Sequence, residues 1–109
     1  MIYAIEALGS NCIKFGIAKR VGYRQRVLQT GSPYELAVRA IADWPDSAEQ
    51  RIHDFLAADH VRGEWFRDGD KALEVIRHMN TSTYAEFDAM LISGMPRRLR
   101  HHLASVPRG

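Results

Sequence analysis

The chain has 109 residues and a mass of 12.4 kDa, which is the size of one domain with a core of its own. Hydrophobic residues make up 46% and charged residues 26%, which excludes a disordered or fibrous protein. Cys12 is the only cysteine, so a disulfide framework and a multi-cysteine zinc site are excluded, and we expect a reducing, cytoplasmic location. We expect no membrane association, because no apolar run reaches the roughly 18 residues of a membrane span and the first eight residues are unlike a signal peptide.

The net charge of +2 hides blocks of opposite sign along the chain. Residues 13–39 carry +5 and residues 95–109 carry +4, whereas residues 40–94 carry −6. A polyanion such as nucleic acid is a suitable partner for the two basic blocks, although a merely solvated arginine-rich surface remains the alternative. The basic residues that we expect to contact nucleic acid are Lys19, Arg20, Arg26, Arg97, Arg98 and Arg100.

The first half of the chain predicts a β-hairpin, a helix and a third strand. Residues 2–8 and 12–18 are rich in β-formers, and the turn residues between them predict a hairpin. Residues 19–29 have helical spacing and predict a short basic helix, which a Thr-Gly-Ser-Pro stretch ends. Residues 35–44 fit a third strand, because a two-stranded sheet alone would be marginal.

The next helix, over residues 47–58, has the clearest pattern in the chain. Its expected start carries two capping-box patterns, Asp46 with Glu49 and Ser47 with Gln50. An apolar stripe marks the face that we expect to be buried. It consists of Ala48, Ile52, Phe55 and Leu56.

Two further helices are predicted after a polar loop. One begins near Asp70, and the other follows a capping box of Thr83 with Glu86 and ends at Gly94. The order ββαβα followed by helices indicates an α/β protein of the α+β type, with a small three-stranded antiparallel sheet flanked by helices. We expect a domain over residues 1–78 and a helical extension with a basic tail over residues 79–109.

Five positions in this layout form a recognisable set: Tyr3 on the first strand, Lys14 and Gly16 on the second, Arg24 on the first helix and Glu49 on the second helix. The stretches around them are Ile2-Tyr3, Lys14-Phe15-Gly16-Ile17, residues 24–33, residues 48–53 and Gly63-Glu64-Trp65-Phe66. With these motifs, residues 1 to 78 resemble the GIY-YIG nuclease superfamily. The similarity is to its small phage and bacterial branch, in which the second motif has a lysine, here Lys14-Phe15-Gly16.

The resemblance implies a metal-dependent nuclease site on the surface of a small antiparallel sheet. Carried over, it assigns Tyr3 to activating water, Arg24 to the phosphate and Glu49 to the divalent metal. The chemistry agrees, because a single carboxylate with waters and substrate phosphate suits Mg²⁺, for which we expect Mn²⁺ to substitute. The planar guanidinium of Arg24 matches two phosphate oxygens and stays charged at any working pH.

Tyr3 needs help to act as a base, because the reference pKa of tyrosine is about 10. A hairpin that turns near Ser10 would put Lys14 beside Tyr3, where its ammonium would favour the phenolate, so we expect Lys14 to tune Tyr3. His53 follows Glu49 by one helical turn and could hold a water on the metal, contact phosphate or shuttle a proton.

Three more residues belong to the structural part of the motif. Gly16 would permit the close approach of another group, although a glycine in a strand more often marks a bulge. We expect Trp65 and Phe66 to be core or wall residues, with base stacking as the alternative. Taken one at a time, Tyr3 could equally be an ordinary strand tyrosine and Glu49 a capping residue, so only the combination points to a nuclease.

The chain also departs from the superfamily pattern. Met1 replaces the glycine of the first motif, Lys14 replaces the tyrosine of the second, and Leu28 stands where a histidine is often found. The leading interpretation is a Mg²⁺-dependent endonuclease acting on DNA. A nucleic-acid-binding module that does not cut, and a phage or mobile-element regulatory protein that acts through a protein partner, are the alternatives. A homodimer is also left open.

Overall fold

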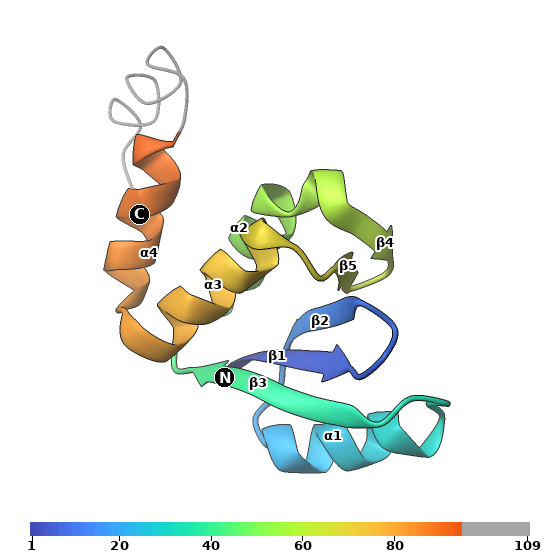
Figure 1. Ribbon diagram of the computed structural model, residues 1–109. Coiled ribbons are helices and arrows are strands. Elements are labelled where there is room, and N and C mark those ends of the chain that lie inside the picture. The colour runs from blue at the N-terminus through green and yellow to red at the C-terminus, as the bar shows by residue number, and fades with distance from the viewer. Residues whose placement is uncertain (95–109) are drawn as a thin grey trace.

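The computed structural model describes residues 1–94, which fold into one antiparallel sheet with helices on both faces. The five strands lie in the order β3-β1-β2-β5-β4. Helix α1 covers one face of the sheet, and helices α2, α3 and α4 lie on the opposite side (Figure 1). The elements are β1 (Ile2–Ala7), β2 (Cys12–Ile17), α1 (Val21–Thr30), β3 (Leu36–Ala42), α2 (Ser47–Phe55), a short 3₁₀ turn (Ala57–Asp59), β4 (His60–Arg62), β5 (Trp65–Arg67), α3 (Asp70–Thr81) and α4 (Tyr84–Ser93).

The predicted hairpin is confirmed and forms the centre of the sheet. Its register pairs Ile2 with Ile17 and Ala7 with Cys12, and the expected third strand, β3, pairs with the other side of β1. Because side chains alternate along a strand, the two faces of β1 have different surroundings. Ile2 belongs to the core beneath α2, α3 and α4, whereas Tyr3 belongs to a smaller cluster beneath α1.

The α+β class is confirmed, but the expectation of three strands is wrong, because β4 and β5 add a second hairpin. Each of these strands has only three residues, which is too short to show an alternating pattern in the sequence. Gly63 makes the turn between them at φ +55°, a left-handed conformation that glycine adopts without strain. Strand β5 pairs with β2, so that Trp65 lies opposite Lys14.

The larger core lies between the sheet and the three helices on its second face. Three residues of the stripe predicted for α2, Ala48, Ile52 and Leu56, are fully buried there, whereas Phe55 is partly buried against the same core. Phe87 of α4 stacks on Trp44 at a centroid distance of 4.9 Å and belongs to the same core. The division of the chain at residue 78, which falls inside α3, stays a prediction.

The capping box predicted for α4 is confirmed. The Thr83 hydroxyl accepts a hydrogen bond from the Glu86 amide at 3.2 Å, and the Thr83 amide donates to the Glu86 carboxylate at 3.1 Å. This exchange satisfies two amides that the start of the helix would otherwise leave without partners.

The two capping boxes predicted for α2 are wrong. Asp46 precedes the helix with a helical backbone (φ −57°, ψ −31°) and makes no side-chain cap. Side-chain capping normally uses an extended residue at this position, because that conformation aims its oxygen back at the first turn. The side chain of Gln50 instead donates to Asp54 at 2.8 Å. The carboxylate of Glu49 is therefore left for other contacts.

Candidate active site

The α1 face of the central hairpin carries Tyr3, Lys14 and Gly16. Tyr3 lies directly opposite Gly16, and Lys14 lies opposite Ile5, so Lys14 is diagonal to Tyr3 instead of beside it as expected. A Cβ atom at residue 16 would lie 2.5 Å from the Tyr3 Oη and 2.9 Å from Glu64 Oε2. The pairing of β1 with β2 has no register shift at this point. Gly16 therefore permits a close approach and does not mark a bulge.

Glu64 is the residue of this site that the sequence analysis missed. It adjoins β5, and its carboxylate forms an ion pair with Lys14 at 3.1 Å. The Lys14 ammonium also lies 5.7 Å from the centre of the Trp65 ring. From the sequence, Glu64 was recognised only as part of the Gly63–Phe66 motif. The short β4–β5 hairpin, which places Glu64 next to β2, was not predicted.

Tyr3 has an unusual environment for a tyrosine. Its side chain is fully buried, and its Oη makes no hydrogen bond of standard geometry within residues 1–94, although the Arg24 side chain is near enough to act on it by charge and by a looser hydrogen bond. Burial raises the pKa of Tyr3 above its usual value, Glu64 raises this pKa further, and Arg24 opposes both. The Lys14 ammonium is paired with Glu64 in this arrangement, and the expectation that Lys14 tunes Tyr3 stays a prediction.

Glu49 lies close enough to this group to interact with it. Partial burial raises the pKa of Glu49 above its ordinary value, and the negative charge of Glu64 raises it further, whereas His53 and Lys14 lower it. Two carboxylates that repel each other at a partly buried position favour a hard divalent cation between or beside them. In the described part of the chain, no cluster of three His, Cys, Asp or Glu residues forms a ready-made metal site. An ion here would therefore depend on Glu49, with water and substrate oxygens as its other ligands.

His53 holds α2 against the sheet. Its Nε2 lies 2.9 Å from the carbonyl oxygen of Phe15, and because a carbonyl can only accept, this nitrogen must carry the hydrogen and donate it. Its ring also packs against Phe66 at 4.9 Å. His53 thereby fixes the helix that carries Glu49 next to β2, close to Gly16.

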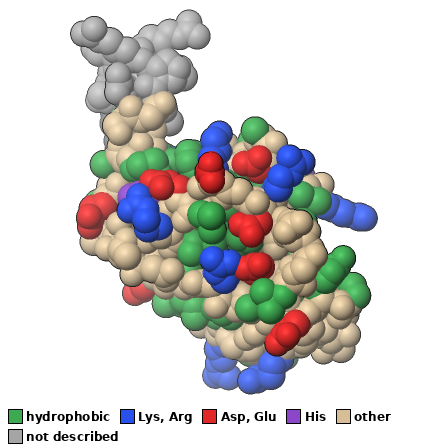
Figure 2. All heavy atoms as spheres, viewed as in Figure 1, with side chains coloured by type: hydrophobic (Ala, Val, Ile, Leu, Met, Phe, Trp, Pro, Cys, Tyr) green, Lys and Arg blue, Asp and Glu red, His purple; other side chains and the backbone are tan. Residues whose placement is uncertain are grey.

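The basic residues of the first block gather around the start of α1. Lys19, Arg20 and Arg24, together with Tyr23, line a hollow of about 370 Å³. All three cations are exposed, and none forms an ion pair with another described residue. Figure 2 shows blue side chains of Lys and Arg at the bottom of the molecule, where α1 lies. Arg26, also exposed, lies further along the same helix.

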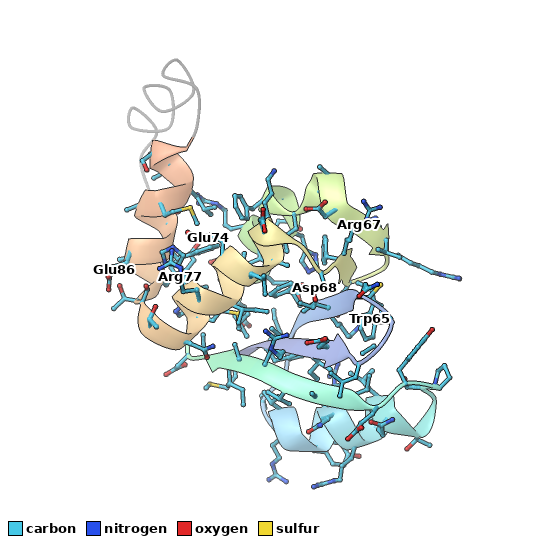
Figure 3. All side chains as sticks on the ribbon, viewed as in Figure 1. Trp65, Arg67, Asp68, Glu74, Arg77 and Glu86 are labelled. Carbon is cyan, nitrogen blue, oxygen red and sulfur yellow. The ribbon has the colours of Figure 1, made fainter. Side chains whose placement is uncertain are left out.

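The remaining predicted residues lie away from the centre of the site. Phe66 is 1% exposed and belongs to the larger core, as expected. Trp65 is half-buried on the α1 side and packs against the smaller cluster, so it is a wall residue (Figure 3). Arg97, Arg98 and Arg100 lie outside the described residues.

The comparisons with known proteins identify a domain family that covers most of the chain. The family model of the T5orf172 domain matches residues 1–80. No curated protein and no solved structure matches the chain. Over residues 1–94, no helix has the length and apolar character needed to cross a membrane. The chain belongs to the T5orf172 domain family, a domain found in phage and mobile-element proteins and associated with GIY-YIG-like nuclease folds.

Proposed function

We propose that the protein is a metal-dependent endonuclease of the GIY-YIG type that hydrolyses phosphodiester bonds in DNA. The T5orf172 family suggests a nuclease or DNA-binding module. One observation carries the finer proposal: Tyr3, Arg24 and Glu49 come from three separate elements, and the charges of Arg24 and Glu49 both act on the Tyr3 hydroxyl. A base, a cation for phosphate and a carboxylate ligand are the groups that this hydrolysis needs.

Arg24 binds the phosphate in this proposal. Arg24 is an exposed residue, and Lys19 and Arg20 line the same hollow, so neighbouring phosphates of one strand can be held by the same basic surface. As the oxygen of water attacks phosphorus, the bond to the leaving oxygen breaks and negative charge grows on the other phosphate oxygens. A bidentate Arg24 stabilises this charge more in the transition state than in the bound substrate.

Tyr3 accepts the proton of the attacking water, and the leaving oxygen takes a proton from solvent. This role requires the phenolate, whose formation Glu64 and Glu49 both oppose. Glu49 is the residue that would hold Mg²⁺, or Mn²⁺ in its place, and the ion would supply a Lewis acid for the phosphate oxygens. Neutralising Glu49 also removes one of the two acidic contributions that raise the pKa of Tyr3.

His53 and Lys14 position these groups. His53 is tied to the Phe15 carbonyl, and Lys14 is tied to Glu64, so both act on the chemistry through a neighbour. Glu64 lies against Gly16 next to the Tyr3 hydroxyl, and its side chain is 37% exposed. A substrate phosphate that approaches Tyr3 must therefore displace Glu64, which the exposed side chain can do by rotation.

A nucleic-acid-binding module that does not cut is the second candidate. The buried, protonated state of Tyr3 favours it, because a phenol with a raised pKa is a poor base. The basic surface on α1 would serve this function equally well.

Cleavage assays separate the two candidates. Labelled single-stranded, duplex and branched DNA, with RNA of the same sequence, are incubated with the protein in Mg²⁺, Mn²⁺ or EDTA. We expect metal-dependent cleavage of DNA that falls about 10²- to 10³-fold in Arg24→Ala, as for the loss of one charge-stabilising group. Tyr3→Phe should lose cleavage to a similar extent, whereas Arg26→Ala, on the same helix, should only weaken binding.

Two outcomes contradict the proposal. Binding without cleavage by the unaltered protein would establish the second candidate. Equal cleavage by Arg24→Ala and Arg26→Ala would show that the basic helix contributes only general attraction to the substrate.

A further inference from the structure

A cavity of about 570 Å³ opens on the α1 side of the sheet, next to the candidate active site. Its walls come from the turn of the β1–β2 hairpin, from the second half of α1 with the loop that follows it, and from the β4–β5 hairpin. Trp65 and Tyr34 contribute aromatic rings, and Val27 and Val61 contribute apolar side chains. This volume exceeds the size of one nucleobase.

Three large apolar side chains of this cavity lie outside both core clusters. Val27 is 52% exposed, Tyr34 is 44% exposed and Val61 is 51% exposed. Figure 2 shows hydrophobic side chains at the right edge of the molecule, where Figure 1 places the β1–β2 turn and the loop between α1 and β3. Large apolar side chains that are exposed together around a concave surface mark a binding site.

The charge around the cavity indicates what kind of ligand it takes. Arg62 is the single charged residue of the lining, which contains no acid. Arg67 pairs with Cys12, a lining residue, and therefore points to the same face of the sheet. Neither arginine forms an ion pair within residues 1–94.

The two serine hydroxyl groups of the lining are already used within the protein. The Ser10 hydroxyl donates to the carbonyl of Ala7 at 2.6 Å, and the Ser32 hydroxyl donates to the carbonyl of Tyr34 at 2.9 Å. The surface thus offers aromatic rings, apolar side chains and guanidinium groups. These groups suit a ligand with an aromatic body and a negative charge, which describes a nucleotide.

The cavity and the candidate active site are close neighbours on one face. Trp65 lies opposite Lys14, and Lys14 precedes Gly16 by two residues. The Trp65 backbone is therefore about 7 Å along β2 and about 5 Å across the sheet from Gly16. The Lys14–Glu64 ion pair lies between the two places.

We propose that this cavity holds an unpaired base of the strand whose phosphodiester bond lies at Tyr3, Arg24 and Glu49. The proposal rests on the proposed function and adds the class of substrate, which is nucleic acid with single-stranded character at the site. A base within a duplex has both faces covered by its neighbours. It can contact the rings of Trp65 and Tyr34 only when it is outside the stack.

The test measures binding in EDTA, so that it does not depend on cleavage. Fluorescence anisotropy follows a single-stranded DNA oligonucleotide, its fully paired duplex and a series in which one abasic position moves along the strand. We expect one abasic position to weaken binding about tenfold, the effect of losing one stacked base. In the Tyr34→Ala variant, the same abasic position should weaken binding by less than about twofold. The two changes remove the same contact, so their effects are not additive.

Two further variants sharpen the test. Arg62→Ala should reduce the salt dependence of binding by about one released ion. Leu73→Ala on α3 is the matched control, because Leu73 has the same 44% exposure as Tyr34 but lies outside the cavity. It should keep the full sensitivity to the abasic position.

Several results would overturn the proposal. Equal abasic sensitivity in Tyr34→Ala and Leu73→Ala would remove the base from the cavity, and so would binding of the duplex as tightly as the single strand. A change from dimer to monomer in Tyr34→Ala, measured by sedimentation, would assign the cavity to a second copy of the chain.

The test also separates this proposal from the proposed function. If Tyr34→Ala abolishes the sensitivity to the abasic position but the protein never cuts DNA, only the proposed hydrolysis is contradicted. If the protein cuts DNA with a metal but Tyr34→Ala keeps the full sensitivity to the abasic position, only the proposal that the cavity holds a base is contradicted. If Arg24→Ala loses cleavage, and Tyr34→Ala still abolishes the sensitivity to the abasic position in that background, both proposals are supported.

Discussion

The first turns of α2 and α4 have similar sequences but different structures. Each has a glutamate three residues after a residue that commonly caps helices, Glu49 after Asp46 and Glu86 after Thr83. In α4 the pair exchanges hydrogen bonds, and these bonds lower the pKa of Glu86 below its ordinary value. In α2 no side-chain cap forms, and burial with the charge of Glu64 raises the pKa of Glu49.

The difference shows how to recognise a carboxylate that is available to a ligand. Glu86 is exposed and satisfied by its own helix, whereas Glu49 is partly buried near Glu64, Lys14 and His53, all from outside its first turn. A carboxylate that is held at such a place without a hydrogen-bonded role is costly to the fold. In the proposed function, Glu49 is the metal ligand, and this role explains why a destabilising carboxylate is kept at this position.

The largest expected effect of this contrast is on cleavage. Glu49→Gln removes the negative charge but keeps the size of the side chain, and we expect cleavage to fall at least about 10²-fold. Glu86→Gln makes the same chemical change at the matching position of α4 and should leave the rate per folded molecule unchanged. Initial rates on one DNA substrate, normalised to the folded fraction from circular dichroism, measure both. Similar losses in the two variants would break the comparison.

The close contacts at Gly16 give the next largest effect. Gly16→Ala would place a methyl group against Tyr3 Oη and Glu64 Oε2, and we expect it to destabilise the protein by about 1–3 kcal/mol because the buried ring cannot move away. Gly22→Ala is the control, because a Cβ there meets nothing within 4 Å, and it should stabilise α1 by about 0.5–1 kcal/mol. Urea denaturation measures both changes. Unchanged stability in Gly16→Ala would mean that Tyr3 lies further from the strand.

The capping residues themselves should differ in a smaller way. Thr83→Ala removes the cap of α4 and should cost about 1 kcal/mol. Asp46→Ala removes a side chain that caps nothing, so its effect should stay within about 0.5 kcal/mol. Thermal denaturation of the two variants at one pH is sufficient. A cost for Asp46→Ala as large as that for Thr83→Ala would show that α2 is capped in solution.

The smallest effects are in the pH dependence of stability, and they have opposite signs. The raised pKa of Glu49 means that the native state keeps this proton longer than the unfolded state, so stability falls as the pH rises above the ordinary value of 4.5. Glu49→Gln should therefore be more stable than the unaltered protein at pH 7, and the gain should vanish below about pH 4.

For Glu86 the pKa is lowered, so its stabilising contribution is present above 4.5 and is lost as the pH falls through the lower folded value. Glu86→Gln should be less stable at pH 7 and equal to the unaltered protein in acid. Melting temperatures from pH 3 to pH 8 test both variants. The same sign for both at pH 7 would contradict the assignment of Glu49.

Much of the fold follows from short-range patterns in the sequence. The alternation on either side of Gly9, the helical spacing before Gly31 and the stripe on α2 each depend on neighbours within one element, and the structure has these elements. The second hairpin was missed because three-residue strands carry no readable period and depend on pairing with β2. Because this hairpin was not predicted, the position of Glu64 beside Lys14 and Gly16 was not predicted either.

The sequence suggested which residues form the candidate site, but their contacts could not be predicted from it. The order of Tyr3, Arg24 and Glu49 along the chain was visible, because each lies in an element with a clear local pattern. The neighbours of Lys14 could not be predicted. Whether Lys14 lies opposite Tyr3 or diagonal to it depends on the register of the hairpin. The role of Asp46 also could not be predicted, because its backbone angles depend on how α2 joins the sheet.

The sequence by itself determined the central hairpin, the helices and the apolar stripe of α2, because these depend on local spacing and residue type. The tertiary structure alone decided that Glu64 lies against Gly16 beside Tyr3, that Glu49 caps nothing, and that Trp65 and Tyr34 share one cavity. The physical reason is that these contacts join residues that are distant in the chain, and their geometry is set by strand register and by the packing of helices on the sheet.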